Sequence, residues 1–92
     1  MSECAYKAGG LYIALLHAPY TGKSFKAVVD GTKGKRTAVP EPGLGDAAYS
    51  FRESGREPAL LDVLKDGRLV QITAPTVATG RQAARAVLRR LG

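Results

Sequence analysis

The 92-residue sequence holds only one cysteine and one histidine. Cys4 has no second cysteine with which to form an internal disulfide, and Cys4 with His17 falls short of the four clustered ligands of a structural zinc site. No apolar run approaches the ~18 to 20 residues of a membrane-spanning helix. These scarcities exclude a disulfide-rich fold and an integral helical membrane protein. We expect no metal and no other cofactor.

Acidic residues are scarce beside the basic ones. Fourteen Lys and Arg face eight Asp and Glu, which gives a net charge of +6. The segment 74–92 carries four arginines and no acid. This balance is typical of a protein that meets an anionic partner, whether nucleic acid, membrane surface or acidic protein. It also fits charge that serves solubility alone, so both interpretations stay open.

Length and termini limit the organisation of the chain. A chain of 92 residues accommodates one hydrophobic core, so we expect a single domain over residues 1–92. The first residues lack the basic start and apolar stretch of a secretory signal. The sequence therefore predicts either a cytoplasmic protein or a mature fragment without its leader.

The N-terminal half predicts a hairpin, a short helix and a loop. Strands are expected at residues 4–8 and 11–17, because Gly9-Gly10 between them supplies the positive φ angles of a tight turn. Thr21 is placed to cap a helix that Gly31 ends. Residues 32–46 predict a crossing loop with a brief extended piece at 37–39. The hairpin register is tested by three expected pairs: Ala8 with Leu11, Tyr6 with Ile13, and Cys4 with Leu15.

The C-terminal half predicts three strands and a helix. Residues 47–52 alternate like a strand, and residues 59–65 and 68–73 flank Asp66-Gly67, a strong hairpin signal. A capping box from Thr79 to Gln82 is expected to begin the last helix. The predicted inner face of the hairpin consists of Leu61, Val63, Val70 and Ile72.

Together these elements predict an α+β fold in the order ββαβββα. We expect a two-layer sandwich, in which an antiparallel sheet of about five strands carries both helices on one face.

No residue pattern names a reaction. Thr21-Gly-Lys-Ser24 matches the end of a phosphate-binding P-loop, but His17 stands where that motif needs its first glycine. A capped helix start is the local interpretation. Cys4 and His17 do not form a convincing nucleophile and base, because the register places Cys4 beside Leu15 and no acid is assigned to orient the histidine. We expect no catalytic residue and no enzyme.

Two surfaces are candidates for binding. Arg81, Arg85 and Arg89 stand one turn apart on the last helix, a spacing suited to contacts with phosphates or another anion. The outer sheet face carries an apolar set that indicates a partner, most simply a second copy paired sheet to sheet or edge to edge. Alternatively, loop 32–46 folds over that set. Its predicted members are Tyr12, Leu60, Leu64 and Leu69.

The segment Val39-Pro-Glu-Pro-Gly-Leu-Gly-Asp-Ala-Ala-Tyr49, followed by the hairpin tip Lys65-Asp66-Gly67 and a terminal Ala-rich helix, resembles a pattern in small bacterial cell-envelope lipoproteins. The resemblance covers roughly the C-terminal half, and weakly Cys4–Tyr6. It implies a PsbP-like α+β sandwich, a non-enzymatic role and a location in the cell envelope.

The sequence thus predicts a non-catalytic binding or assembly domain that forms a homodimer through its sheet. The alternative is an anion- or nucleic-acid-binding domain that acts through the arginine helix.

Overall fold

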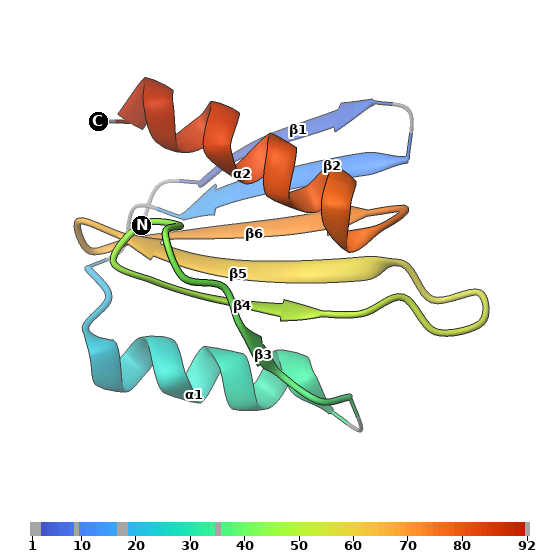
Figure 1. Cartoon of the computed structure of the whole chain (residues 1–92). Coiled ribbons are helices and arrows are strands. Elements are labelled where there is room, and N and C mark those ends of the chain that lie inside the picture. Colours follow the sequence, from blue (N-terminus) through green and yellow to red (C-terminus); the bar gives the residue numbers. More distant parts are fainter. Residues whose placement is uncertain (1–2, 9, 17–18, 35, 92) are drawn as a thin grey trace.

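The computed structural model describes residues 3–8, 10–16, 19–34 and 36–91, which form one open sheet and two helices (Figure 1). Gly9 and His17 lie outside the described residues. The strands are β1 (Glu3–Ala8), β2 (Leu11–Leu16), β3 (Val39–Pro40), β4 (Ala47–Phe51), β5 (Ala59–Lys65) and β6 (Arg68–Ala74), and the helices are α1 (Gly22–Lys33) and α2 (Val77–Leu91).

The sheet has the strand order β1-β2-β6-β5-β4-β3, and each neighbouring pair is antiparallel. Its centre is the β5–β6 hairpin, which turns with positive φ at both Asp66 (50°) and Gly67 (76°), as a tight two-residue turn requires. The α+β class, the antiparallel sheet and the ββαβββα order of the longer elements along the chain are confirmed, with β3 as an additional two-residue strand. The expected registers are confirmed too: Val63 pairs with Val70, Leu61 with Ile72, Ala8 with Leu11, Tyr6 with Ile13, and Cys4 with Leu15.

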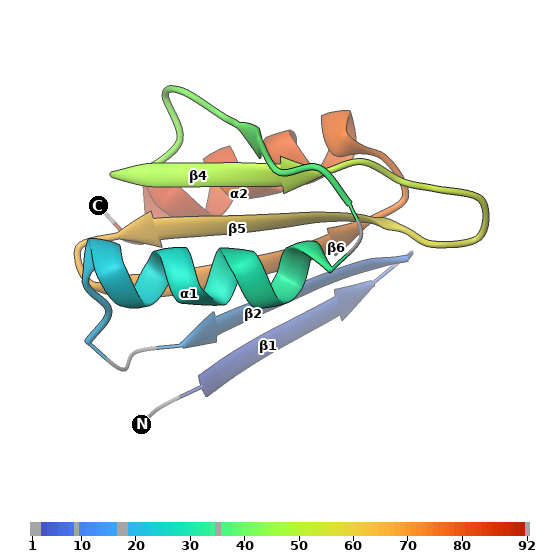
Figure 2. The ribbon, with the colours of Figure 1, turned by 90° about the horizontal axis from the view of Figure 1, so that it is seen from below.

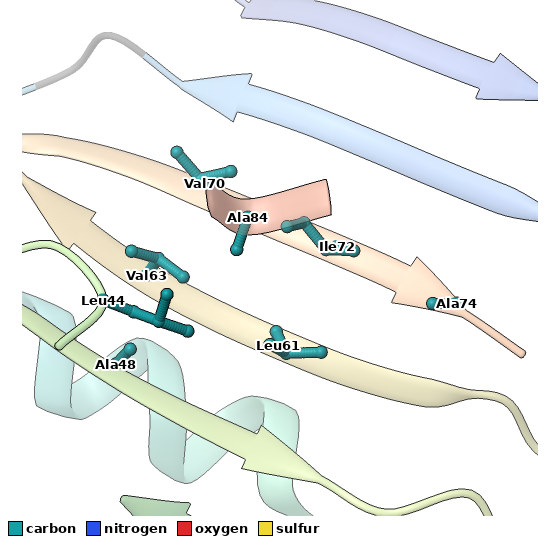
Figure 3. Packing of buried hydrophobic residues seen from close by; sticks show 8 residues of the cluster. All are labelled: Leu44, Ala48, Leu61, Val63, Val70, Ile72, Ala74 and Ala84. Carbon is teal, nitrogen blue, oxygen red and sulfur yellow. The ribbon is translucent and has the colours of Figure 1, made fainter. Parts of the chain in front are cut away.

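One face of the sheet, which we call the α2 face, packs against α2. The predicted inner residues of the hairpin lie here, and Ala84 of α2 is buried against them. Figure 3 shows this packing, including Leu44, which enters the core from the β3–β4 connection. Sequence patterns did not predict a core role for Leu44. The described core cluster contains Leu44, Ala48, Leu61, Val63, Val70, Ile72, Ala74 and Ala84.

The opposite face, which we call the α1 face, packs against α1, and the sheet therefore separates the two helices (Figures 1 and 2). The prediction of both helices on one face is wrong. Its physical reason lies in the central hairpin, because Leu60, Leu64 and Leu69 form a second apolar set on the face opposite the α2 core, and this set also requires cover. The buried residues of this second cluster are Phe25, Val29, Phe51, Leu64 and Leu69.

The helix boundaries differ from the predicted ones. Thr21 caps α1 as expected, and Ser24 completes its capping box. The helix continues past Gly31, however, and ends at Gly34. The start of α2 was predicted at Thr79, but Thr76 is the cap: its hydroxyl accepts a hydrogen bond from the Thr79 backbone N–H at 3.2 Å.

The β3–β4 connection is held against the hairpin end. The Asp46 N–H donates to the Leu64 carbonyl at 2.7 Å, and the Asp46 carboxylate accepts from the Asp66 N–H at 2.8 Å. Between Leu44 and Asp46, Gly45 has φ of 59°, and a Cβ there would lie 2.5 Å from the Leu64 carbonyl oxygen. Only glycine fits this close approach without a shift of the backbone.

We expect Gly45→Ala to lower the free energy of unfolding by about 2 to 4 kcal/mol, because it adds both a left-handed strain and a backbone clash. Urea denaturation measures the change. Gly31→Ala is the matched control, since Gly31 lies inside α1 with open space around it; this change should raise stability by roughly 0.5 to 1 kcal/mol. Equal effects of the two substitutions would contradict the described path of the connection.

Candidate functional site

The arginines of α2 differ in their partners. The Arg81 Nε donates to Glu41 Oε1 at 2.6 Å, and its Nη2 donates to Glu41 Oε2 at 2.9 Å. Such a paired contact fixes the guanidinium and neutralises it locally. Arg85 and Arg89 are exposed, farther along the helix. The expected row of three free arginines is therefore reduced to two.

Glu41 joins the β3–β4 connection to α2. It is 8% exposed, and its Oε2 also accepts a hydrogen bond from the Ser50 hydroxyl of β4 at 2.6 Å. The hydrogen bond from Arg81 is the largest influence on this carboxyl and, with that from Ser50, outweighs burial, so the pKa of Glu41 lies below its ordinary 4.5. The ion pair therefore persists at neutral pH.

An open basic depression lies between α2 and the β3–β4 connection. Its volume is about 470 Å³, and Lys65 of β5 joins Arg85 and Arg89 in its lining. The described residues that line it include no carboxylate; the full set is Gly43, Leu44, Gly45, Lys65, Arg85, Leu88 and Arg89. We call this site the basic depression.

Lys65 and the Gly43–Gly45 segment were not predicted as parts of a site. Lys65 is the last residue of β5, and the fold places it beside α2 residues that are at least twenty positions away in sequence. The glycines at 43 and 45 were a visible signal for an unusual turn, but nothing in the sequence indicates which helix that turn meets. Sequence reasoning therefore found two of the three cations of the basic depression.

The predicted partner-binding set of the outer sheet face is mostly covered. Leu64 is 8% exposed and Leu69 is 2% exposed, because α1 lies over both. Leu60 is partly buried in the same cluster, whereas Tyr12 on β2 is 39% exposed. The expectation of an uncovered apolar face is wrong at Leu64 and Leu69. From the loop 32–46 that was the predicted alternative cover, Ala38 also packs against this cluster.

The other motifs lead to no reaction chemistry. In Thr21–Ser24, both hydroxyl side chains take part in the α1 capping box. Cys4 pairs with Leu15 through the backbone, and its proposed partner His17 lies outside the described residues. Within the part of the chain that the structure describes, no group of three His, Cys, Asp or Glu residues is arranged to hold a metal ion. None of the described helices is long and apolar enough to span a membrane.

Comparison of the chain with protein-family models, with curated proteins and with solved structures finds no match. The resemblance to cell-envelope lipoproteins therefore stays a prediction. The residues that carry it have a local role: Leu44 fills the core, Gly45 permits the close approach to β5, and Asp46 binds the hairpin end.

We expect Glu41→Gln to lower the free energy of unfolding at neutral pH by about 1.5 to 3 kcal/mol, the typical contribution of hydrogen bonds to a charged group. Because the folded-state pKa of Glu41 is depressed, its stabilisation is present above about 4.5 and is lost as the pH falls through the lower folded value. Denaturant titrations at neutral and strongly acidic pH measure this. The difference between wild type and variant should shrink in acid, and a constant difference would contradict the ion pair.

Proposed function

We propose that this chain is a non-catalytic binding domain that holds a phosphate-bearing polyanion in the basic depression. The observation that carries the proposal is the convergence of Lys65, Arg85 and Arg89 on one open concavity whose described lining holds no carboxylate. Lys65 has one acidic neighbour outside that lining, since its Nζ lies 3.8 Å from the Asp66 carboxylate. The three cations come from two different elements, β5 and α2, so a ligand in the depression is approached from two sides.

Electrostatics favour an anion at this place. The net charge of +6 attracts polyanions over a distance of about one Debye length, ~8 Å at physiological salt. Closer to the surface, the exposed guanidiniums of Arg85 and Arg89 are suited to the planar, two-pronged contact that arginine makes with phosphate. Arg81 takes no part, because Glu41 engages it; its role is to position the neighbouring connection.

The lining also indicates which part of a nucleic acid the basic depression would contact. Its described residues include no aromatic side chain on which a base could stack. Binding in the depression would therefore follow the sugar-phosphate backbone and depend weakly on base sequence. A phosphate-rich strand is the favoured partner, and other linear polyanions share the required chemistry.

We expect the full chain to bind a fluorescent single-stranded DNA oligonucleotide at low ionic strength, with affinity that falls as salt rises. Arg85→Gln/Arg89→Gln should weaken binding, and the slope of log K against log salt should decrease by roughly 0.7 for each lost phosphate contact. Fluorescence anisotropy over a series of salt concentrations measures both quantities.

Arg52→Gln/Arg56→Gln is the control, because it removes the same charge from two exposed arginines outside the basic depression. It should lower affinity much less than the α2 double variant. Absence of binding at low salt, or equal losses in the two double variants, would count against the proposal.

A second candidate function, homodimeric assembly, rests on the difference between the two sheet edges. The β3 edge is two residues long and contains Pro40, features that discourage pairing with another chain. The β1 edge is six residues long and, among the described strands, pairs with β2 alone. Two copies joined antiparallel at β1 would extend one continuous sheet. This arrangement keeps the predicted homodimer while leaving Leu64 and Leu69 in the core.

We expect sedimentation equilibrium at micromolar concentration to give a dimer. Ala5→Pro and Tyr6→Pro test the edge together, because successive N–H groups of a strand point to opposite sides and proline lacks this donor. One of the two variants should become monomeric while keeping its circular dichroism spectrum, and the other should lose stability. A monomeric wild type, or a dimer that survives both substitutions, would exclude assembly through β1.

A further inference from the structure

Asp62, in the middle of β5, is a buried acid that folding alone does not explain. It is 1% exposed, and its side chain belongs to the α1 face, where it follows Leu60 and precedes Leu64. Gln71 of β6 is its direct cross-strand neighbour, and the Gln71 Nε2 donates to Asp62 Oδ1 at 3.3 Å. The second oxygen, Oδ2, is buried and has no hydrogen-bond partner among the described residues.

A small pocket lies beside this carboxyl. Helix α1 lies in front of β5 and β6 on the α1 face and leaves β1 uncovered (Figure 2), while Leu16 of β2 packs against the edge of its cluster. At the border of the covered region is a pocket of about 230 Å³. Thr32 from the last turn of α1, Gln71 and Thr73 from β6, and Tyr12 from β2 line it together with Asp62.

We propose that this pocket binds a small organic cation, an alkylammonium or alkylguanidinium group, whose N–H donors pair with Asp62. Asp62 supplies the counter-charge for such a ligand, and the half-exposed Tyr12 contributes an aromatic ring to the same lining. Leu60 supplies an apolar contact for the alkyl part. The site is separate from the basic depression, which lies on the α2 face and takes the opposite charge.

The chemistry of the lining favours an organic cation over a metal ion. Calcium takes six to eight oxygen ligands and magnesium a near-ideal octahedral set, commonly with more than one carboxylate. Here Asp62 is the single carboxylate, and the remaining oxygens belong to hydroxyl and amide groups. One carboxylate oxygen with a nearby hydroxyl and aromatic ring is instead suited to N–H donors on a single cationic head group.

The electrostatics of Asp62 point the same way. Burial raises the pKa of this carboxyl, and the neighbouring polar side chains of Thr32 and Gln71 offset only part of the effect. A buried carboxylate without a counter-charge is costly, so a bound cation stabilises the ionised form in a way that the protein itself does not. The pocket is also smaller than the ~300 Å³ at the lower end for drug-sized ligands, which restricts the ligand to a short chain.

The test is an NMR titration of the ¹⁵N-labelled full chain at neutral pH with n-butylammonium and n-propylguanidinium. 1-Butanol serves as the neutral analogue of nearly equal size. We expect saturable shifts of the Thr32, Asp62 and Gln71 amides with the cations, and affinity for the alcohol lower by about tenfold or more. Equal affinities for cation and alcohol would reduce the site to an apolar crevice and overturn the proposal.

Asp62→Asn should abolish cation binding while the spectrum stays dispersed, because the substitution removes charge and keeps shape. Asp30→Asn is the matched control, since Asp30 is an exposed acid of α1 outside the pocket lining. Tyr12→Ala gives a second measure that does not disturb the core, and it should weaken the cations more than the alcohol. Absence of saturable shifts in the wild type, or unchanged binding in Asp62→Asn, would overturn the assignment.

Discussion

The fold depends on a central hairpin that carries apolar side chains on both faces. Leu61 and Val63 point to one face of β5, and Leu60 and Leu64 point to the other. Full burial of one such side chain contributes about 1.5 to 3 kcal/mol, so a sheet covered on one face alone would forgo several such contributions. One helix therefore packs on each face, and α1 and α2 are separated by the sheet although the chain is short (Figure 1). The tight turn at Asp66 fixes the register that keeps the two apolar sets apart.

The basic depression follows from that arrangement through one ion pair. Once α2 lies on the sheet, Arg81 faces Glu41 of the β3–β4 connection, and the pair holds this connection beside the exposed end of the helix. The same connection is also fixed by Leu44, which is buried in the core, and by the close approach of Gly45 to β5. The basic depression thus lies between a helix and a connection that are both packed against the sheet. Their fixed positions limit the distance between the cationic side chains that line it. Removal of the Glu41 carboxylate would break the contact between the β3–β4 connection and α2. It would also leave the Arg81 guanidinium without its ion-pair partner.

Local patterns in the sequence predicted the five longer strands, the pairing within the two hairpins and the class of fold, because Asp66-Gly67 and period-two alternation act over a few residues. They did not predict how the hairpins and β4 pair with one another. The prediction of both helices on one face was wrong because the outer apolar residues Leu60, Leu64 and Leu69 were interpreted as a surface for a partner. In the structure these residues are the packing site of α1. The start of α2 was missed for a local reason, since two Thr residues compete as caps and Pro75 ends the strand just before Thr76. Glu41 and Arg81 are forty positions apart, and no local pattern connects such residues.

Asp62 marks the limit of an explanation based on folding. The apolar row Leu60 and Leu64 continues on either side of it, and an apolar residue between them would extend the cluster beneath α1 without an unpaired oxygen. Replacing both members of a buried polar pair, here Asp62 and Gln71, by apolar groups of similar shape can be nearly neutral or stabilising, so stability gives no reason for a carboxylate here. A donor from outside the chain does give one, because it satisfies Oδ2 and offsets the burial of charge together. The same reasoning separates Arg81, whose charge the fold uses, from Arg85 and Arg89, which form no salt bridge with another described residue.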